Sequence, residues 1–452
     1  MTAQLSKTRF QYGLQCLKRL YLESCHEELA DPVDPGLQAR FDTGTTVGEV
    51  ARERFPNGTL IEESHLEHDQ AVDTTQTLLT DDSVPALYEP AFTFQGIRTR
   101  VDVLNKNGPR EFDLVEVKSS TRLKPEHITD VAIQVYALEG SGVPIKGAYL
   151  MHLNNAYVYQ GGDHDLDQLF TLEDITTPAR SFIEKRVPDD LSRMWSTLEL
   201  DDPPDIETGP HCTRPYRCSF YGHCHQDEPR TDGQPSISPS LRSRLEEITL
   251  PAGFLDFETI SPAIPLYPNT RPYQPIPFQW SLHILDSFGK LTHDTFLNDD
   301  AKDPRERFII TLLEAIPHQG AIVTYSSYEN SILNGLARAF PLYRDRLFAL
   351  CDRMVDLLKL IRENYYHLDF NGSYSLKSVA PTLVPDLNYN DLDIQDGTAA
   401  STAYTTMVAE DTPESEKTSI REALLAYCAR DTEATVSVYD VLLSESKNSK
   451  LR

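Results

Sequence analysis

The chain has 452 residues, 40% of them apolar and 25% charged, which is typical of folded proteins and excludes a largely disordered one. At this length two domains of roughly 200 residues are expected, because a single hydrophobic core stops growing earlier. The net charge of −27 argues against a protein that coats nucleic acid non-specifically, and we attribute the excess to a solvated acidic surface.

The sequence contains no segment typical of membrane insertion or secretion. No apolar run approaches the roughly 20 residues that span a bilayer, and MTAQLSKTRFQYG lacks the apolar stretch of a secretory signal. We therefore expect a cytoplasmic protein without a membrane partner. Seven cysteines, an odd number in a chain without a signal, argue against a disulfide framework.

Helical and strand patterns alternate in both halves of the chain. In the first half, periodicity predicts two helices, over 45–55 and 127–140, and strands over 91–104 and 110–120. In the second half it predicts strands over 252–260 and 277–286 and a long amphipathic helix over 421–443. This mixture predicts the α/β class for both halves.

The stretch 227–250 is rich in proline, serine and charge, and it lacks an apolar stripe before Leu241. Such composition is typical of a linker, here leading into a short helix. We therefore predict a first domain over 1–226 and a second over 251–446.

Glu116 and Lys118 in LVEVKSS lie two apart on a predicted strand, so their side chains project from the same face. Asn107 and Gly108 favour a hairpin turn, which would bring Asp102 beside Glu116 on the neighbouring strand. Two adjacent carboxylates bind Mg²⁺ or Mn²⁺, and Lys118 would position a water or the scissile phosphate. Taken alone, a surface Glu-x-Lys pair on an edge strand is the alternative.

The order of Asp, turn, Glu-x-Lys and a helix with Gln134 and Tyr136 resembles the PD-(D/E)XK nuclease superfamily, specifically its RecB-like branch. The resemblance implies a restriction-endonuclease-like core in which Asp102 and Glu116 bind the metal and Lys118 is the catalytic lysine.

Two further expectations come from the same resemblance. Gln134 and Tyr136 would line the site from their helix. One more acidic ligand is expected from the first helix, for which Glu49 in VGEVARE is the first candidate, with Glu89 in LYEPAF as the second.

Three cysteines cluster near the end of the first predicted domain. HCTRPYRCSFYGHC separates Cys212, Cys218 and Cys224 by two equal gaps of five residues, with proline and glycine between them to bend the chain. Two interpretations stay open: an iron–sulfur cluster completed by a distant cysteine, or a tetrahedral zinc completed by a histidine. The candidate histidines are His211, His223 and His225. Cys25, Cys351 and Cys428 lie among helical apolar residues and are predicted to be packed thiols.

The cysteine pattern is similar to that of RecB-like nucleases of the AddB and CRISPR-adaptation type, which hold a [4Fe–4S] cluster on one cysteine before the core and three after it. The resemblance implies that Cys16 in YGLQCLKRLYLE is the fourth ligand, with Zn²⁺ as the alternative. Lys7, Arg9, Lys18 and Arg19 alternate with aromatic residues around Cys16, which suits single-stranded nucleic acid and equally an ordinary amphipathic helix.

A second set of acids occurs in the second predicted domain. Asp256 and Glu258 in FLDFET lie two apart on a predicted strand, and Tyr427 and Asp431 lie four apart on a predicted helix, so each pair shares a face. Each pattern alone is also typical of a solvated surface. Together they favour a two-metal site.

This pattern resembles the DEDD exonucleases of the ribonuclease H-like fold, in the subgroup with a tyrosine in the third motif. The resemblance implies that Asp256, Glu258 and Asp431 bind metal and that Tyr427 orients the attacking water. Glu329 occupies the position of the second-motif aspartate in AIVTYSSYENSIL, and Asp356 is the alternative fourth ligand.

The whole arrangement resembles a bacterial and archaeal family with these two nuclease domains. The resemblance implies a divalent-metal nuclease acting on the ends of DNA or RNA. Two alternatives stay open: an iron–sulfur or zinc nucleic-acid-binding scaffold with inactive centres, and a small-nucleotide phosphodiesterase, which the charge of −27 fits better.

Overall fold

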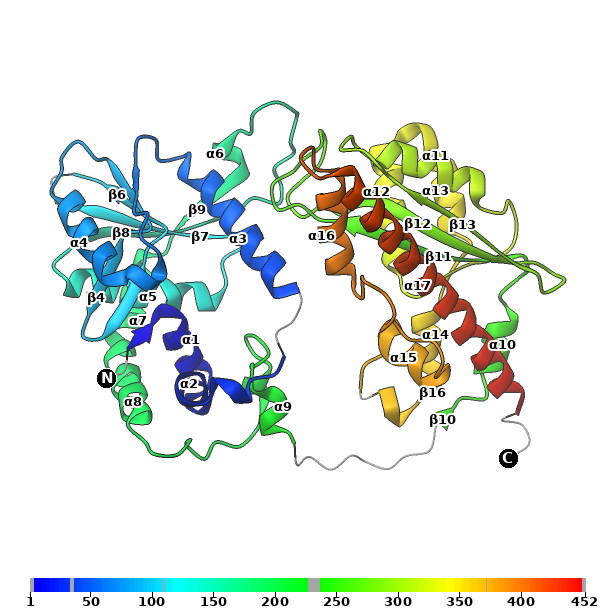
Figure 1. The fold of residues 1–452 in the computed structure, drawn as a ribbon, viewed down its shortest axis with the longest axis horizontal. Helices are drawn as coiled ribbons and strands as arrows, with labels where there is room; N and C mark the ends of the chain where they lie inside the picture. The colour runs from blue at the N-terminus through cyan, green and yellow to red at the C-terminus, as the bar shows by residue number, and fades with distance from the viewer. Residues whose placement is uncertain (1–3, 33–35, 109, 227–235, 371, 449–452) are drawn as a thin grey trace. The chain divides into compact units, whose positions relative to one another are not determined.

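The computed structural model describes residues 4–32, 36–108, 110–226, 236–370 and 372–448 (Figure 1). The chain divides into two compact units: residues 1–228 with 263–273, and residues 229–262 with 274–452. Both units combine sheets with covering helices, so the predicted α/β class is confirmed. No helix among the described residues is both long and apolar enough to cross a membrane.

The first unit is built on a six-stranded mixed sheet in the order β2-β3-β6-β7-β8-β9. The central pairs differ in direction, since β6 and β7 are antiparallel whereas β7 and β8 are parallel. The strands are β2 (Thr59–Leu60), β3 (Ala86–Tyr88), β6 (Val103–Lys106), β7 (Phe112–Lys118), β8 (Ile145–Leu153) and β9 (Phe170–Asp174).

The strand predicted over 91–104 is divided in the structure. Gln95 and Gly96 both have positive φ, which turns the chain into a hairpin of β4 (Ala91–Phe94) and β5 (Ile97–Arg100). A short strand near the N-terminus, β1 (Leu5–Ser6), pairs in parallel with β5. These three strands form a separate small sheet.

Helix α5 (Pro125–Gly140) covers the six-stranded sheet and begins with proline in its first turn, where the missing N–H costs nothing. Its residues Val131, Val135 and Leu138 recur at helical spacing and pack against Leu114 and Leu150 of the sheet. Each fully buried aliphatic side chain contributes about 1.5–3 kcal/mol, so this face fixes α5 over β7 and β8.

The other helices of the first unit come before, between and after the strands of this sheet along the chain (Figure 1). Cys16 has an extended backbone with φ of −163°, which ends α1 and begins α2. The helices are α1 (Lys7–Gln15), α2 (Leu17–Cys25), α3 (Gly36–Arg52), α4 (His68–Leu79), α6 (Leu166–Leu169), α7 (Thr176–Lys185), α8 (Val187–Leu198) and α9 (Tyr221–Cys224).

Residues 263–273 belong to the first unit although they lie far along the chain. The N–H of Asn269 donates to the carbonyl of Tyr159 at 2.7 Å, and the Tyr159 N–H donates to the carbonyl of Thr270 at 3.0 Å. The Tyr273 hydroxyl donates to the carbonyl of Ser119, the residue after Lys118, at 2.5 Å. A division of the chain at 227–250 leaves this segment with the second domain, whereas these bonds join it to the first.

Part of the predicted linker, residues 227–235, lies outside the described residues. The rest contains β10 (Ser236–Ile237) and the predicted short helix, α10 (Leu241–Glu246). Leu241 and Leu245 of α10 are fully buried in a core of the second unit, so this helix is part of that unit's fold.

The second unit contains a five-stranded sheet in the order β13-β12-β11-β14-β15. Strands β12 and β13 run antiparallel to their neighbours, whereas β14 and β15 run parallel to β11. The strands are β11 (Ala252–Ile260), β12 (Ile276–Leu285), β13 (Leu291–Leu297), β14 (Ile322–Thr324) and β15 (Met354–Asp356), with β16 (Tyr365–Tyr366) pairing β10.

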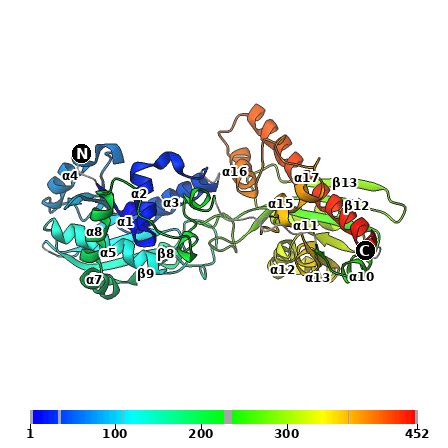
Figure 2. The same cartoon turned by 90° about the horizontal axis from the view of Figure 1, so that it is seen from below.

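Helices cover both faces of this sheet (Figure 2). Phe254 of β11 packs with Tyr439 of α17 (Glu414–Asn448) in one core. Leu255 and Phe257 face a second core on the opposite side. The helices on that side are α11 (Arg305–Ala315), α12 (Tyr328–Ala339) and α13 (Arg344–Cys351); the unit also contains α14 (Leu357–Asn364), α15 (Leu376–Leu383) and α16 (Gly397–Val408).

Candidate metal centres and cysteine cluster

Glu116 lies at the middle of the first candidate centre, on β7, with a side chain only 1% exposed. Its carboxylate accepts hydrogen bonds from the Lys118 ammonium at 2.6 Å and from the Gln134 amide at 2.8 Å. The Lys7 ammonium donates to both oxygens, at 3.0 and 3.3 Å. Burial by itself would raise the pKa of Glu116, but the charges of Lys118 and Lys7 outweigh it and hold the pKa below its usual range.

Asp102 and Glu116 lie next to the end of the antiparallel pairing of β6 with β7, where Val103 pairs with Val115. One Asp102 oxygen accepts the N–H of Val117 at 2.6 Å. Burial and the charge of Glu116 raise the pKa of Asp102 to about 7. A divalent cation would relieve this repulsion, so the carboxylate pair fits Mg²⁺ or Mn²⁺.

Lys118 also donates to Asp130 of α5 at 2.6 Å, and this acid was not anticipated from the sequence. Burial and the neighbouring Glu116 raise the pKa of Asp130. Asp130 precedes Gln134 by four residues and therefore shares its helical face. That spacing was the signal that could have identified Asp130.

Gln134 is fully buried, and its amide oxygen has no hydrogen-bond partner among the described residues. Tyr136 does not join it. The Tyr136 hydroxyl donates to the Gln95 side chain at 3.2 Å, and its ring packs edge-on against Phe94. Two residues along a helix turn the side chain to the opposite face, so Tyr136 does not lie on the Gln134 face of α5.

The two candidates for an additional acid differ in position. Glu49 is exposed on α3, and no hydrogen bond joins it to Asp102 or Glu116 in the described part of the chain. Glu89 follows β3, pairs with Arg52 at 2.9 Å, and adds to burial and Glu116 in raising the pKa of Asp102. The structure thus brings the second candidate to the centre rather than the first.

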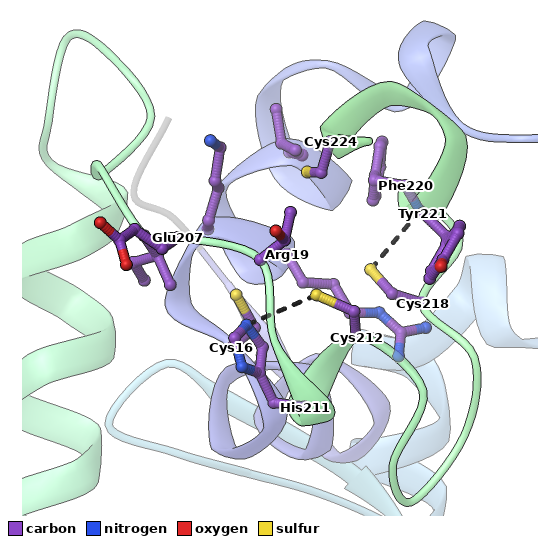
Figure 3. A pocket seen from close by; sticks show the side chains of 13 residues that line it. Cys16, Arg19, Glu207, His211, Cys212, Cys218, Phe220, Tyr221 and Cys224 are labelled. Carbon is purple, nitrogen blue, oxygen red and sulfur yellow. Dashed lines mark hydrogen bonds between the residues drawn. The ribbon is translucent and has the colours of Figure 1, made fainter. Parts of the chain in front are cut away.

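The cysteine cluster consists of Cys16, Cys212, Cys218 and Cys224, whose side chains line one pocket (Figure 3). Cys16 lies between α1 and α2, and the other three come from the turn and loop that end in α9. All four thiols are free. Burial raises the pKa of Cys218 and of Cys224, and the nearby thiols raise both further. A bound cation would compensate such a group.

The sulfur atoms of this cluster are not tightly grouped. Within the described ranges, ligand atoms of three or more residues lie within 4.8 Å of one another at Asp256, Glu258 and Cys428, and no such group is found among the four cysteines. The Cys212 sulfur has a histidine nitrogen, Nε2 of His211, at 3.7 Å.

The second candidate centre lies between β11 and α17. Even-numbered residues of β11 face α17, as the Phe254–Tyr439 contact shows, so Asp256 and Glu258 project toward the helix that carries Tyr427 and Asp431. The prediction that their carboxylates share one face agrees with this alternation.

The acids of this centre repel one another. Burial, followed by the charge of Asp431, raises the pKa of Asp256 and of Glu258 well above the usual range. Burial raises the pKa of Glu329 on α12 to about 8, with Asp356 and Asp431 adding to the effect. One buried Glu329 oxygen has no hydrogen-bond partner among the described residues. These oxygen donors suit Mg²⁺ or Mn²⁺.

Asp356, the alternative fourth ligand, ends β15 and caps α14. One of its oxygens accepts the N–H of Lys359 at 2.8 Å, which explains its position without a metal. Its charge raises the pKa of Glu329, whereas the acids whose charges raise the pKa of Asp256 are Asp431, Glu258 and Glu329.

Three side chains of this centre were not identified from the sequence. The Tyr389 hydroxyl donates to Asp431 at 2.5 Å, and the Lys377 ammonium donates to the Tyr427 hydroxyl at 2.9 Å. Cys428, predicted as a packed thiol, is buried but lies against the acids, 3.5 Å from an Asp256 oxygen. Lys377 lies on α15, which α16 separates from α17 along the chain.

Comparisons with known proteins give a partial match. A family described as Domain of unknown function (DUF2779) matches residues 253–375, which include Asp256, Glu258 and Glu329 but end before Tyr427 and Asp431. No curated protein matches the chain.

Two solved structures show a distant likeness. The crystal structure of an alkaline exonuclease (LHK-Exo) from Laribacter hongkongensis is 13% identical with a TM-score of 0.26, over 44% of this chain and 91% of that chain. The crystal structure of SSO0001 is 13% identical with a TM-score of 0.21, over 45% of this chain and 80% of that chain. A likeness at these TM-scores carries no argument about activity.

Proposed function

We propose that the chain is a divalent-metal nuclease with two separate centres that hydrolyse phosphodiester bonds at the ends of DNA or RNA. The observation that carries the proposal is the buried group of Asp102, Glu116 and Lys118, which combines a metal-binding carboxylate pair with a lysine. A surface Glu-x-Lys pair would be solvated, whereas this Glu116 is 1% exposed.

In the first unit, the sheet and α5 support the PD-(D/E)XK interpretation. Asp102 and Glu116 would hold the metal. A bound divalent metal, here or in the second unit, supplies activation of a water and stabilisation of charge on the phosphate. Lys118, fixed between Glu116 and Asp130, is held to donate toward a phosphate oxygen or the attacking water. Gln134 orients Glu116 through its amide.

In the second unit, β11 is the middle strand of the sheet, with the antiparallel β12 on one side and the parallel β14 on the other. This strand order supports the ribonuclease H-like interpretation. Asp256, Glu258, Glu329 and Asp431 would hold the metal. The Tyr427 phenol, which accepts from Lys377, would orient the attacking water. Tyr389 fixes Asp431.

For the cysteine cluster we propose a [4Fe–4S] cluster, with Zn²⁺ as the alternative. The proposal is supported by the pocket that the four free thiols line together, with Cys16 from before the sheet and the other three from after it. Purified anaerobically, the protein should be brown and contain iron and sulfide; a colourless protein with one zinc per chain would contradict this proposal.

A small-nucleotide phosphodiesterase is the second candidate, and the net charge of −27 favours it because that substrate needs no basic groove. Salt separates the two. Binding to a polymer weakens steeply as salt rises, whereas hydrolysis of a small nucleotide does not.

The test is cleavage of end-labelled single- and double-stranded DNA and RNA in Mg²⁺ or Mn²⁺, at low and high salt. Wild type should cleave at least one of the four polymers, more slowly at high salt, and not at all in EDTA. Lys118→Ala should lose the contribution of the first centre. Wild type that is inert on all four polymers under anaerobic conditions would refute the proposal.

A further inference from the structure

Lys7, to which the nuclease resemblance gives no role, reaches the first centre from the N-terminal helix α1. Leu5 is fully buried and pairs with Ile97 of β5, and the Ser6 hydroxyl caps α1 by accepting the N–H of Arg9 at 3.1 Å. Lys7 follows as the first residue of α1. Its ammonium lies 3.0 and 3.3 Å from the two oxygens of Glu116, 109 residues away along the chain.

The far end of α1 is fixed as well. The Gln15 amide donates to the carbonyls of His211 and Tyr216, both at 2.7 Å, and the helix ends on Cys16 of the cysteine cluster. Midway, Thr129 of α5 donates to the Gln11 side chain at 2.9 Å. The ammonium of Lys7 is therefore delivered by a short helix held at its start, middle and end.

The two lysines on Glu116 differ in how they are held. Lys118 bridges Glu116 and Asp130 at 2.6 Å each. Lys7 donates to Glu116 alone among the residues that the structure describes. A divalent cation that takes Glu116 as a ligand must share the carboxylate oxygens with an ammonium group or displace it. Lys7 has one hydrogen-bond partner to lose, whereas Lys118 has two.

We propose that Lys7 is a built-in competitor for divalent metal at the first centre: its ammonium neutralises Glu116 and must leave that carboxylate when metal binds. Lys7 thereby sets the metal concentration at which the centre loads. The inference rests on the proposed function, because it takes Asp102 and Glu116 to be metal ligands. It assigns to Lys7 a regulatory contact, whereas the composition around Cys16 suits single-stranded nucleic acid and an ordinary amphipathic helix equally.

The test measures Mn²⁺ binding to the full chain in the absence of nucleic acid. The free Mn²⁺ that remains at each concentration is measured by electron paramagnetic resonance. An Asp256→Asn, Asp431→Asn background removes the second centre. Lys7→Met removes the charge at similar length, Lys7→Arg keeps it, and Arg9→Met removes a charge from the same helix without touching Glu116. Thermal unfolding of each variant verifies that it is folded, and Lys7→Gln replaces Lys7→Met if the latter does not fold.

Lys7→Met should bind Mn²⁺ at the first centre at least tenfold more tightly than the background protein, which corresponds to about 1.4 kcal/mol. Lys7→Arg and Arg9→Met should bind as the background does. Unchanged or weaker Mn²⁺ binding by Lys7→Met would overturn the inference about Lys7 and leave the proposed function standing. If no Mn²⁺ binding is lost on Glu116→Gln, the metal centre itself fails, and the inference and the proposed function of this centre fall together.

Discussion

Glu329 should destabilise the metal-free protein at neutral pH, and Glu329→Gln should remove that penalty. The side chain is 5% exposed and burial raises its pKa from 4.5 to about 8. In the unfolded chain Glu329 is charged at pH 7, whereas in the folded protein it must bind a proton or be buried as an anion. Folding therefore takes up a proton, and stability falls as pH rises.

The magnitude follows from the two pKa values. Below pH 4.5 both states are protonated and no penalty exists. At pH 7, about 2.5 units above the ordinary value, the penalty is about 3 kcal/mol at ~1.4 kcal/mol per unit. Above pH 8 it no longer grows. The amide of glutamine meets the same surroundings as the protonated carboxyl, so its desolvation cost nearly cancels in the comparison.

The assay is urea unfolding in EDTA at pH 4 and pH 7, with Glu314→Gln on the exposed face of α11 as the matched control. The free energy of unfolding of Glu329→Gln should exceed that of wild type by about 3 kcal/mol at pH 7 and equal it at pH 4. Excess Mn²⁺ should reverse the order, because wild type gains binding free energy that the variant lacks. A difference that is the same at both pH values would refute the reasoning.

Three further outcomes are expected. Tyr389→Phe removes the donor to Asp431, and in metal-free urea unfolding it should cost about 1.5–3 kcal/mol; unchanged stability would contradict the assigned bond. Lys118→Ala should slow cleavage by the first centre on the order of 100-fold, measured with Asp256→Ala present, while a rate equal to the parent would remove Lys118 from the mechanism. A fragment of residues 1–226 should have a lower melting temperature, measured by circular dichroism, than the same fragment with residues 263–273 appended through a flexible linker. Equal melting temperatures would show that Tyr273 and its neighbours do not stabilise the unit.

The direction of a side chain could be predicted where strand periodicity alone determines it. Glu116 and Lys118 on β7, and Asp256 and Glu258 on β11, follow from alternation along a strand. Along α5, by contrast, two residues reverse the direction of the side chain, so Tyr136 and Gln134 lie on different faces of the helix.

Other contributors could not be predicted because no local pattern links them to the site. Lys7 meets Glu116 across 109 residues, and Tyr389 meets Asp431 across 42. The segment 263–273 carries no sign in its own residues that it packs with the first unit. Such pairings depend on how helices and loops are placed over the sheets, which is set by packing rather than by periodicity.

The most direct test of two independent centres is the cleavage of one end-labelled strand in Mn²⁺ by Lys118→Ala, Asp256→Ala and the double variant. Each single variant should retain cleavage with its own product pattern, and the double variant should cleave on the order of 100-fold more slowly than Asp256→Ala. Cleavage by the double variant at the wild-type rate would contradict the account.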